Sequence, residues 1–266
     1  QLFDNGWMFC KDSTISAQDP GFNDSQWRIL DLPHDWSIED LPLTDSGEQA
    51  GPFSKSSIGN TATGYSIGGT AWYRKRFITD RSCTGKKIFL SFDGVYMESD
   101  VWVNGKHAGF HPYGYTPFSY DITPFVNETG KTNVVAVRVR NNGRNSRWYS
   151  GSGIYRHVRI SVLNPVHISL CGIYINTPIV TNDSAVVSIE VSIDNASEKS
   201  HKVSVSCLLK GPDGKTVAAS GKGISIDAGK HMVEKIFLTV SNPMLWSVAY
   251  PNLYRATIDL KHDTTV

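Results

Sequence analysis

The chain has 266 residues, of which 40% are hydrophobic and 11% aromatic, so it can bury a large core and form two domains. Its formal net charge of +1 provides no overall field that would attract nucleic acid or an anionic membrane surface. No apolar run approaches the roughly 18 residues that indicate a membrane-spanning helix. We therefore expect neither nucleic acid nor a membrane among the partners of this chain.

The cysteines and the first residue bear on cofactors and cellular compartment. The four cysteines lack CxxC spacing, so neither a zinc site nor a thioredoxin-type motif is indicated. We expect no metal and no cofactor. Buried free thiols are the expected state, although Cys171 and Cys207 could meet inside one domain. The chain begins at Gln1 without an initiator methionine or signal peptide, which indicates a processed or trimmed N-terminus. We favour a periplasmic or secreted location over a cytoplasmic one.

Alternation of apolar and polar residues with period two dominates the chain. The apolar positions of four such segments are Ile88, Leu90 and Phe92; Val135, Val137 and Val139; Val158, Ile160 and Val162; and Val187, Ile189, Val191 and Ile193. This period is typical of half-buried strands. Asn104-Gly105, between two strand-like runs, is the favoured pair for a type I′ hairpin turn. The sequence predicts an all-β protein with only a few per cent helix.

One short helical turn is expected in DITPFVNETG, residues 121–130. Thr123 can serve as N-cap, Pro124 suits the first helical position, and Gly130 follows the end. The segment is a crossover between strands.

Two groups of ionisable residues could suggest catalysis within this chain. Asp93, Glu98 and Asp100 cluster in FDGVYMESD, but a strand sends successive side chains to opposite faces. His34 and Asp35 are adjacent, and neighbouring residues rarely form a useful hydrogen bond with each other. The proline before them marks a rigid turn, which favours a structural or rim role. We expect no catalytic residue in either group.

A basic run extends through the middle of the chain. Its members are Arg138, Arg140, Arg144, Arg147, Arg156 and Arg159. Interleaved aromatic residues would suit a groove for single-stranded nucleic acid. However, the first two arginines alternate with valines on a predicted strand, and no nucleic-acid-binding motif is present. Inter-domain salt bridges and a solvated sheet face explain the run better.

The loop that starts at Asn145 is rich in aromatic residues. Trp148, Tyr149 and Tyr155 offer flat apolar faces with polar tips, and the glycines and serines at 150–153 permit tight turns. This mixture suits a polyol ligand, and it also suits a packed corner of a sandwich. Because Tyr155 and Arg156 lead directly into a strand, we favour a structural role for both, with Arg156 paired to an acid.

FHPYGYT, residues 110–116, is a stronger candidate for ligand contact. His111, Tyr113 and Tyr115 lie beside Pro112 and Gly114 in a segment that must leave the sheet after Phe110. Binding residues collect on such loop tips.

A domain boundary is expected at Asn164-Pro165, where the aromatic, glycine-rich part of the chain gives way to plainer alternating strands. Residues 1–164 fit a jelly-roll β-sandwich. Residues 165–266 fit a smaller β-sandwich of immunoglobulin type.

Five segments, in order, resemble landmarks of glycoside hydrolase family two. They are FNDSQWRILDLPHDWSIED, AWYRKRF, FDGVYMESDVWVNGKHAGFHPYGYTPFSYDIT, SGSGIYRHV and NPMLWSVAYPNLYRATIDL. The resemblance implies a galactose-binding-like jelly roll, then an immunoglobulin-like domain, and in complete members a catalytic (β/α)₈ barrel. Within the family, DLPHDWSIED and HPYGYTPFSYDIT are most similar to β-galactosidases.

The resemblance also implies where catalysis occurs. Members are retaining glycosidases whose two glutamates lie roughly 5 Å apart in the barrel. The barrel is expected to be absent from this chain, which stops at Val266, so we expect the chain alone to be inactive. In the family, the acid/base glutamate follows an asparagine. Asn127-Glu128 matches that dipeptide, but it lies in a polar turn far from any barrel strand, so we regard the match as accidental. In some large β-galactosidases an aspartate matches Tyr113, so no metal-linked role carries over to that position.

The sequence therefore indicates a non-catalytic N-terminal part of a retaining glycosidase, which supports its own barrel and contributes loops to the sugar pocket. The residues expected to contact a β-galactoside are His111, Tyr113, Tyr115 and Trp148. Alternatives are an autonomous carbohydrate-binding module, the same part of a β-glucuronidase or β-mannosidase, and a structural spacer without sugar contact.

Overall fold

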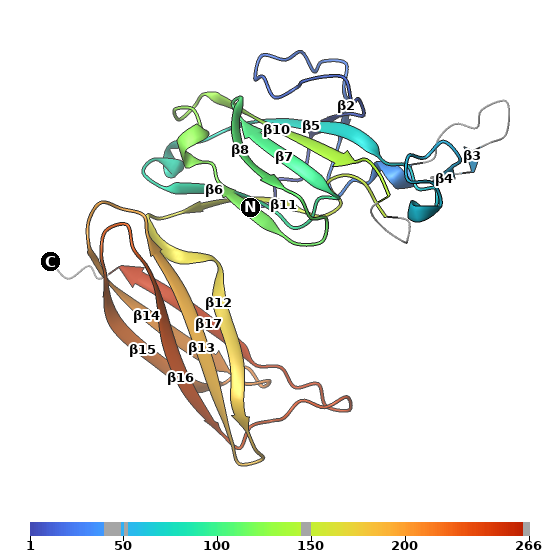
Figure 1. Cartoon of the computed structure of the whole chain (residues 1–266). Coiled ribbons are helices and arrows are strands. Elements are labelled where there is room, and N and C mark those ends of the chain that lie inside the picture. The colour runs from blue at the N-terminus through green and yellow to red at the C-terminus, as the bar shows by residue number, and fades with distance from the viewer. Residues whose placement is uncertain (40–48, 51–52, 145–149, 263–266) are drawn as a thin grey trace. The chain divides into compact units, whose positions relative to one another are not determined.

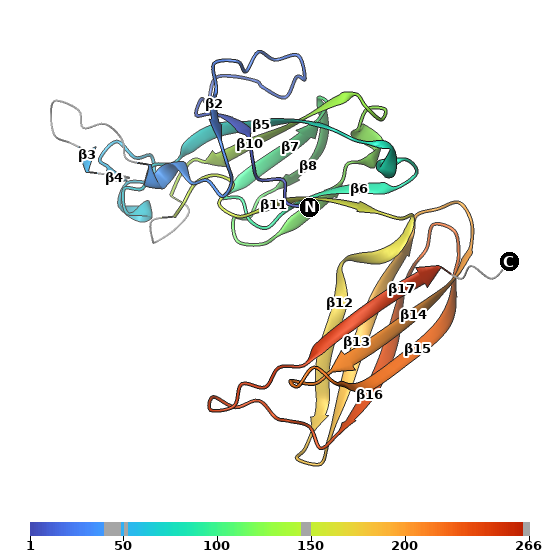
Figure 2. The ribbon, with the colours of Figure 1, turned by 180° about the vertical axis from the view of Figure 1, so that it is seen from behind.

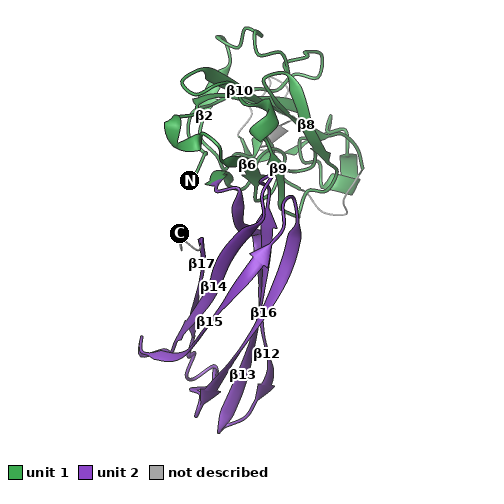
Figure 3. Cartoon of the chain, turned by 90° about the vertical axis from the view of Figure 1, so that its left-hand side faces the viewer, with its two compact units in different colours: residues 1–162 green, residues 163–266 purple. Residues whose placement is uncertain are grey.

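The computed structural model describes residues 1–39, 49–50, 53–144 and 150–262 (Figure 1). Strands account for 52% of the structure and helices for 5%, which confirms the predicted all-β class. The chain divides into two compact units, Gln1–Val162 and Leu163–Val266 (Figure 3). Among the described residues, no helix is long and apolar enough to span a membrane.

The first unit is a jelly-roll sandwich of two main sheets (Figures 1 and 2). One sheet has the strand order β2-β1-β5-β10-β7-β8 and the other β11-β6-β9. Their bounds are β1 Trp7–Cys10, β2 Arg28–Leu30, β5 Gly69–Ile78, β6 Lys87–Phe92, β7 Glu98–Val103, β8 Lys106–His111, β9 Phe118–Asp121, β10 Thr132–Asn141 and β11 Val158–Leu163. The two-residue strands β3 (Gln49–Ala50) and β4 (Phe53–Ser54) pair separately.

Alternating side chains of these strands form the core between the two sheets. Ile88, Leu90 and Phe92 of β6 are buried there, and so are the three valines predicted on β10. Each apolar side chain of this size that leaves water contributes about 1.5–3 kcal/mol. Val162 differs from the expected pattern because it lies on the edge strand β11, where its side chain is exposed.

The outer face of the six-stranded sheet is also covered, by the segment between β1 and β2. Ala17 of this segment packs with Trp72 of β5 and Ala136 of β10. Phe22 and Trp27 pack against the same cluster from the margin. The central strands β5 and β10 are therefore buried on both faces, which explains why β5 carries a run of consecutive buried residues.

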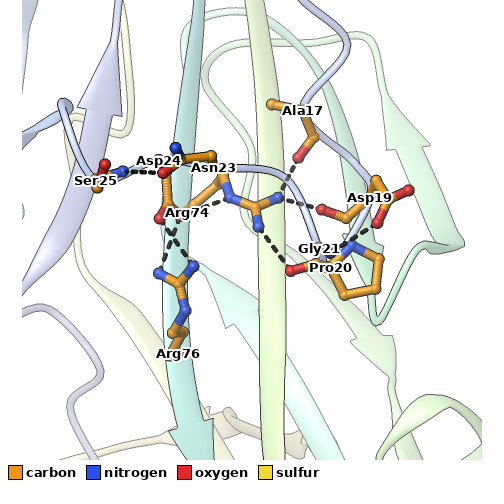
Figure 4. Close-up of polar contacts among 9 residues, drawn as sticks. All are labelled: Ala17, Asp19, Pro20, Gly21, Asn23, Asp24, Ser25, Arg74 and Arg76. Atoms are coloured by element: carbon orange, nitrogen blue, oxygen red, sulfur yellow. Dashed lines mark hydrogen bonds and ion pairs between the residues drawn. The ribbon is translucent and has the colours of Figure 1, made fainter.

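Arg74 fastens this covering segment to the sheet (Figure 4). Its side chain is 0% exposed, and its Nε donates to Asp24 Oδ2 at 2.8 Å. Its terminal nitrogens donate to the backbone carbonyls of Ala17, Asp19 (2.9 Å) and Pro20 (3.3 Å). Burial raises the pKa of Asp24, but hydrogen bonds from the arginines at 76 and 74 outweigh it and leave the pKa below its usual value.

The expected turns are present, with one difference in capping. Asn104 and Gly105 have φ of 51° and 77° and join β7 to β8, which confirms the predicted hairpin. A 3₁₀ turn spans Thr123–Phe125 with proline in its first turn. Its N-cap is Ile122, so the predicted cap at Thr123 is wrong by one residue. The Thr123 hydroxyl instead accepts a hydrogen bond from Ile88 N at 2.8 Å.

The described part of the first unit contains three further 3₁₀ turns: Trp36–Ile38, Asn60–Thr63 and Arg81–Cys83. The second unit is an immunoglobulin-like sandwich with sheets ordered β12-β13-β16 and β15-β14-β17. Its bounds are β12 Val166–Val180, β13 Ser184–Asn195, β14 His201–Lys210, β15 Thr216–Ile226, β16 His231–Ser241 and β17 Arg255–His262.

The core of the second unit is aliphatic and follows the predicted alternation. Val187, Ile189, Val191 and Ile193 of β13 all point into it. Cys207 lies in the same core, whereas Cys171 is exposed on β12, and both are free thiols. The expected burial is therefore wrong for Cys171. The considered pairing of Cys171 with Cys207 is also wrong, because one thiol faces solvent and the other lies in the core.

Candidate functional site

The loop after β8 carries three of the four predicted contact residues. His111 is the last residue of β8, so the sheet continues one residue beyond the expected exit. Its ring stacks on Phe118 with centroids 4.3 Å apart, and its Nε2 lies 3.1 Å from Thr116 Oγ1. Burial lowers the pKa of His111, and hydrogen bonds with the backbone of the same loop oppose this. The imidazole is thus neutral and held in place at neutral pH.

Tyr113 and Tyr115 are the exposed members of this loop. Their side chains are 53% and 56% exposed, and their rings meet edge to face with centroids 5.6 Å apart. Tyr115 also packs edge to face on buried Tyr96, at 5.4 Å. Burial raises the pKa of Tyr115, with the nearby tyrosines adding to the effect. The phenol stays protonated, and it can both donate and accept hydrogen bonds.

Tyr155 fixes the same loop by a hydrogen bond. Its hydroxyl donates to the carbonyl of Gly114 at 2.7 Å. A Cβ at Gly114 would lie 2.2 Å from Cδ2 of Tyr96, so this position requires glycine. Tyr155 therefore has the structural role that was expected for it. Arg156 was expected to pair with an acid, but its guanidinium lies over the Tyr155 ring, 5.6 Å from the centroid. We call Tyr96, Tyr113, Tyr115 and Tyr155 the tyrosine cluster.

Gly153 joins the tyrosine cluster to two other segments. Its N–H and C=O exchange hydrogen bonds with Tyr96, both at 2.9 Å. Its φ is +125°, and a Cβ there would lie 2.4 Å from the Tyr73 hydroxyl. On either side of Gly153, Ile154 O accepts from His34 N at 2.9 Å and Ser152 O accepts from Trp36 N at 3.0 Å. Segments 34–36, 94–96, 111–116 and 150–155 thus meet at one end of the first unit.

His34 and Asp35 are both engaged with partners other than each other. Asp35 Oδ1 accepts from Ser37 N at 2.8 Å and from Ser152 N at 2.7 Å, so it caps the 3₁₀ turn and fixes the 150–155 segment. His34 Nδ1 lies 2.8 Å from the Tyr73 hydroxyl and Nε2 lies 2.7 Å from Glu39 Oε1. These contacts agree with the structural role predicted from the sequence.

The other acidic candidates form ion pairs on the sheet. Asp100 pairs with Arg138 at 2.8 Å and Arg140 at 3.5 Å. Glu98 Oε2 lies 3.4 Å from Arg140 Nε. Asp93 pairs with Arg159, also at 3.4 Å. These pairs agree with the expected sheet face, and each of them joins two residues of the first unit.

The remaining predicted residues are placed as follows. Trp148, Tyr149 and Arg147 lie outside the described residues. Glu128 is exposed and pairs with Lys131 three residues later, at 2.8 Å, as a surface turn would allow. Across the described ranges, no three His, Cys, Asp or Glu side chains gather closely enough to hold a metal ion. Sequence reasoning missed Tyr96 and its pairing with Gly153, although the glycines beside several tyrosines were a usable sign of close packing.

Two family profiles match the chain. The profile of the glycosyl hydrolases family 2 sugar binding domain matches residues 6–165, and a second profile of glycosyl hydrolases family 2 matches residues 166–266. The chain belongs to glycosyl hydrolase family 2. The segments that meet at Gly153 all lie in the part matched by the family's sugar-binding domain.

Similar proteins from this family are known in sequence. The chain is 41% identical over 253 residues to the β-galactosidase BoGH2A of Bacteroides ovatus, covering 95% of this chain and 28% of that protein. It is 36% identical over 255 residues to a putative β-glucuronidase of Formosa agariphila, covering 96% and 23%. The chain thus spans less than a third of the length of these family 2 relatives.

Solved structures of family 2 proteins show the same fold. A family 2 member from Bacteroides cellulosilyticus superposes with a TM-score of 0.91 at 40% identity, covering 99% of this chain and 33% of that one. A β-glucuronidase from Bacteroides uniformis superposes with a TM-score of 0.85 at 27% identity, covering 100% and 30%.

Proposed function

We propose that this chain is the non-catalytic N-terminal part of a retaining β-galactosidase, which supports the catalytic barrel and contributes the 111–116 loop to the sugar pocket. The observation that carries the proposal is the 41% identity to a β-galactosidase across 95% of the chain. Because the chain spans 28% of that protein, the glutamate pair of the barrel is assigned to the remainder.

The geometry of the tyrosine cluster supports a sugar contact. Tyr113 and Tyr115 present exposed aromatic faces and hydroxyls, whereas Tyr96 and Tyr155 hold the loop that bears them. An aromatic face stacks on the C–H groups of a pyranose, and a phenol exchanges hydrogen bonds with its hydroxyls. His111 adds a neutral nitrogen beside the loop. Trp148 remains part of the proposal from the sequence.

A β-glucuronidase is the second candidate. The chain is 36% identical to a putative β-glucuronidase, and the guanidinium of Arg156 lies beside the tyrosine cluster. A guanidinium is the group best suited to bind the carboxylate of a uronic acid. A β-mannosidase and an autonomous binding module are further alternatives, without a specific contact in their favour.

Hydrolysis assays on the complete gene product and on this 266-residue chain test the proposal. We expect the complete product to cleave nitrophenyl β-galactoside at least tenfold more efficiently than the β-glucuronide and β-mannoside. Preference for the glucuronide, lost on Arg156→Gln, would establish the second candidate instead.

The 266-residue chain is expected to show no hydrolysis and to bind galactose only in the millimolar range or weaker, about −4 kcal/mol at most. Turnover that survives purification and disappears in Glu98→Gln or Glu128→Gln would contradict the non-catalytic assignment. Micromolar binding through Tyr113 and Tyr115, measured by calorimetry, would establish an autonomous binding module.

A further inference from the structure

One end of the second unit exposes a concentration of large apolar side chains. Three members of the loop between β16 and β17 are Trp246, 61% exposed, Val248, 90% exposed, and Tyr250, 72% exposed. The whole stretch 241–254, SNPMLWSVAYPNLY, contains no charged residue. Contiguous apolar surface of this kind marks an interaction site more often than an ordinary solvated loop.

Hydrogen bonds within the loop hold these side chains in the exposed position. Met244 N donates to the Tyr254 hydroxyl at 2.7 Å, and Asn252 Nδ2 donates to Leu245 O at 3.0 Å. Ser247 N donates to Tyr250 O at 2.9 Å. The loop is therefore a formed structure whose apolar groups face outward.

A cavity of about 470 Å³ opens beside the loop, at the same end of the second unit. Its lining includes Ile175 and Val180 of β12, Leu209 of β14, Val240 of β16, and Trp246 and Tyr254. Both sheets contribute to this lining, so the cavity is an opening into the aliphatic core. An apolar side chain that entered it would leave water and complete the packing of the core.

The edge strand β12 continues the same surface. Residues 171–182, CGIYINTPIVTN, contain no charged residue, and Ile173, Ile179 and Val180 are exposed. β12 is the outer strand of its sheet, with β13 on its inner side. Edge strands that remain in water are usually protected by charged side chains. The pairing of β12 with β13 shifts register between Ile168 and Ile173 and between Asn176 and Ile179, and Pro178 interrupts it, but the edge has no charged side chain from 171 to 182. Cover by another chain segment accounts for this lack of charge.

We propose that this apolar end, formed by β12 from residue 173 and the 242–254 loop, is the docking surface for the part of the same family 2 polypeptide that the present chain does not span. The inference rests on the proposed function for the existence of that part. The chain spans 28% of one relative and 33% of a solved family member, so a large remainder is available to cover the surface.

The character of the surface fits an attached occupant better than a freely diffusing one. Permanent interfaces have cores depleted in charge and rich in aromatic residues, as 241–254 is. A covalently attached partner stays at high effective concentration, so no charged rim is needed for capture. The predicted contacts are apolar side chains of the remainder against Trp246 and Val248, with one side chain entering the cavity.

Hydrogen exchange measured by mass spectrometry tests the docking directly. We expect peptides covering 173–180 and 242–254 to exchange at least tenfold more slowly in the complete gene product than in the 266-residue chain. Peptides of β15, which does not line the cavity, serve as the internal reference. Equal exchange of the two segments in both proteins would overturn the proposal, whatever glycoside the complete product hydrolyses.

A matched pair of substitutions provides a second measurement. Val248→Asp should lower the melting temperature of the complete product by several degrees and leave that of the 266-residue chain within one degree. Val233→Asp, an exposed valine on β16, should affect both proteins equally. An equal effect of Val248→Asp on both proteins would overturn the docking proposal.

Two other occupants give distinguishable results. If the 266-residue chain forms dimers in sedimentation velocity at micromolar concentration, and Val248→Asp abolishes them, a second copy is the occupant and the proposal is wrong. If the two segments gain protection in the isolated chain only when galacto-oligosaccharide is added, the surface is a sugar platform and the proposal is again wrong. The glycoside preference of the complete product decides the proposed function separately from both measurements.

Discussion

The two units of this chain are stabilised in different ways. In the second unit, strands of 8–15 residues place aliphatic side chains in one core, and alternation alone accounts for most of its order. The first unit contains long segments without regular structure and holds them with polar groups that are buried or half-buried, as the buried Arg74 does for residues 17–24 and the half-buried Asp35 for residues 150–155. Fixed irregular segments can carry a binding site, whereas a regular sandwich supplies support.

Replacing Arg74 should have the largest effect on stability, because its buried hydrogen bonds hold the covering segment on the sheet of the first unit. Arg74→Met should lower the free energy of unfolding of this unit by about 3–5 kcal/mol, since Asp24 would lose its fully buried partner and three carbonyls would lose a donor. Urea unfolding followed by tryptophan fluorescence measures the loss. Arg76→Met is the control, because Arg76 is partly exposed, and we expect it to cost about 1 kcal/mol or less. Equal losses in the two variants would contradict this account.

The second unit should respond to apolar truncation instead. Ile189→Ala removes a side chain that is fully buried in the aliphatic core, and we expect a loss of about 3 kcal/mol in the unfolding of that unit. Glu190→Ala, the next residue on β13, breaks only a surface pair with Lys235 and should cost less than about 1 kcal/mol. Thermal unfolding monitored by calorimetry measures both. A smaller loss for Ile189→Ala than for Glu190→Ala would show that the alternation is not what stabilises this unit.

Tyr113 tests whether the fixed loop of the first unit carries function. In the complete gene product, Tyr113→Ala should reduce kcat/KM by one to two powers of ten, about 1.4–3 kcal/mol, because the side chain contributes to sugar binding. The melting temperature should stay nearly unchanged, since the ring is largely exposed. Ile29→Ala, at another exposed position of this unit, should leave the kinetics unchanged. Normal kinetics with a melting temperature lowered by many degrees would make the loop structural.

The smallest expected effect concerns the support of that loop. Tyr155→Phe removes the hydroxyl that donates to Gly114 O and should cost about 1 kcal/mol of stability. Tyr155 acts through the loop, so we expect KM of the complete product to rise two- to fivefold with kcat nearly unchanged. Substrate titration with the wild type and the variant measures this difference. A fall in kcat with constant KM would contradict the positioning role.

The sequence alone determined the features that depend on neighbouring residues. Period-two alternation identified the strands because a strand turns successive side chains to opposite faces. Asn104-Gly105 specified a hairpin because both residues adopt positive φ with little strain. The exposed loop after β8 could also be recognised, since proline, glycine and two tyrosines follow a strand there. Family landmarks extended this interpretation to the order of the two domains.

Only the tertiary structure decided which distant residues meet. Asp24 and Arg74 lie 50 positions apart, and Asp35 and Ser152 lie 117 apart, so no local pattern relates them. The same holds for Tyr96 and Gly153, whose mutual hydrogen bonds join two of the four segments that meet there. Cys171 and Cys207 remain free because one faces solvent and the other the core, a difference that cysteine counting does not detect. Long-range contacts of this kind depend on how the sheets pack, because packing fixes which buried polar group finds a partner.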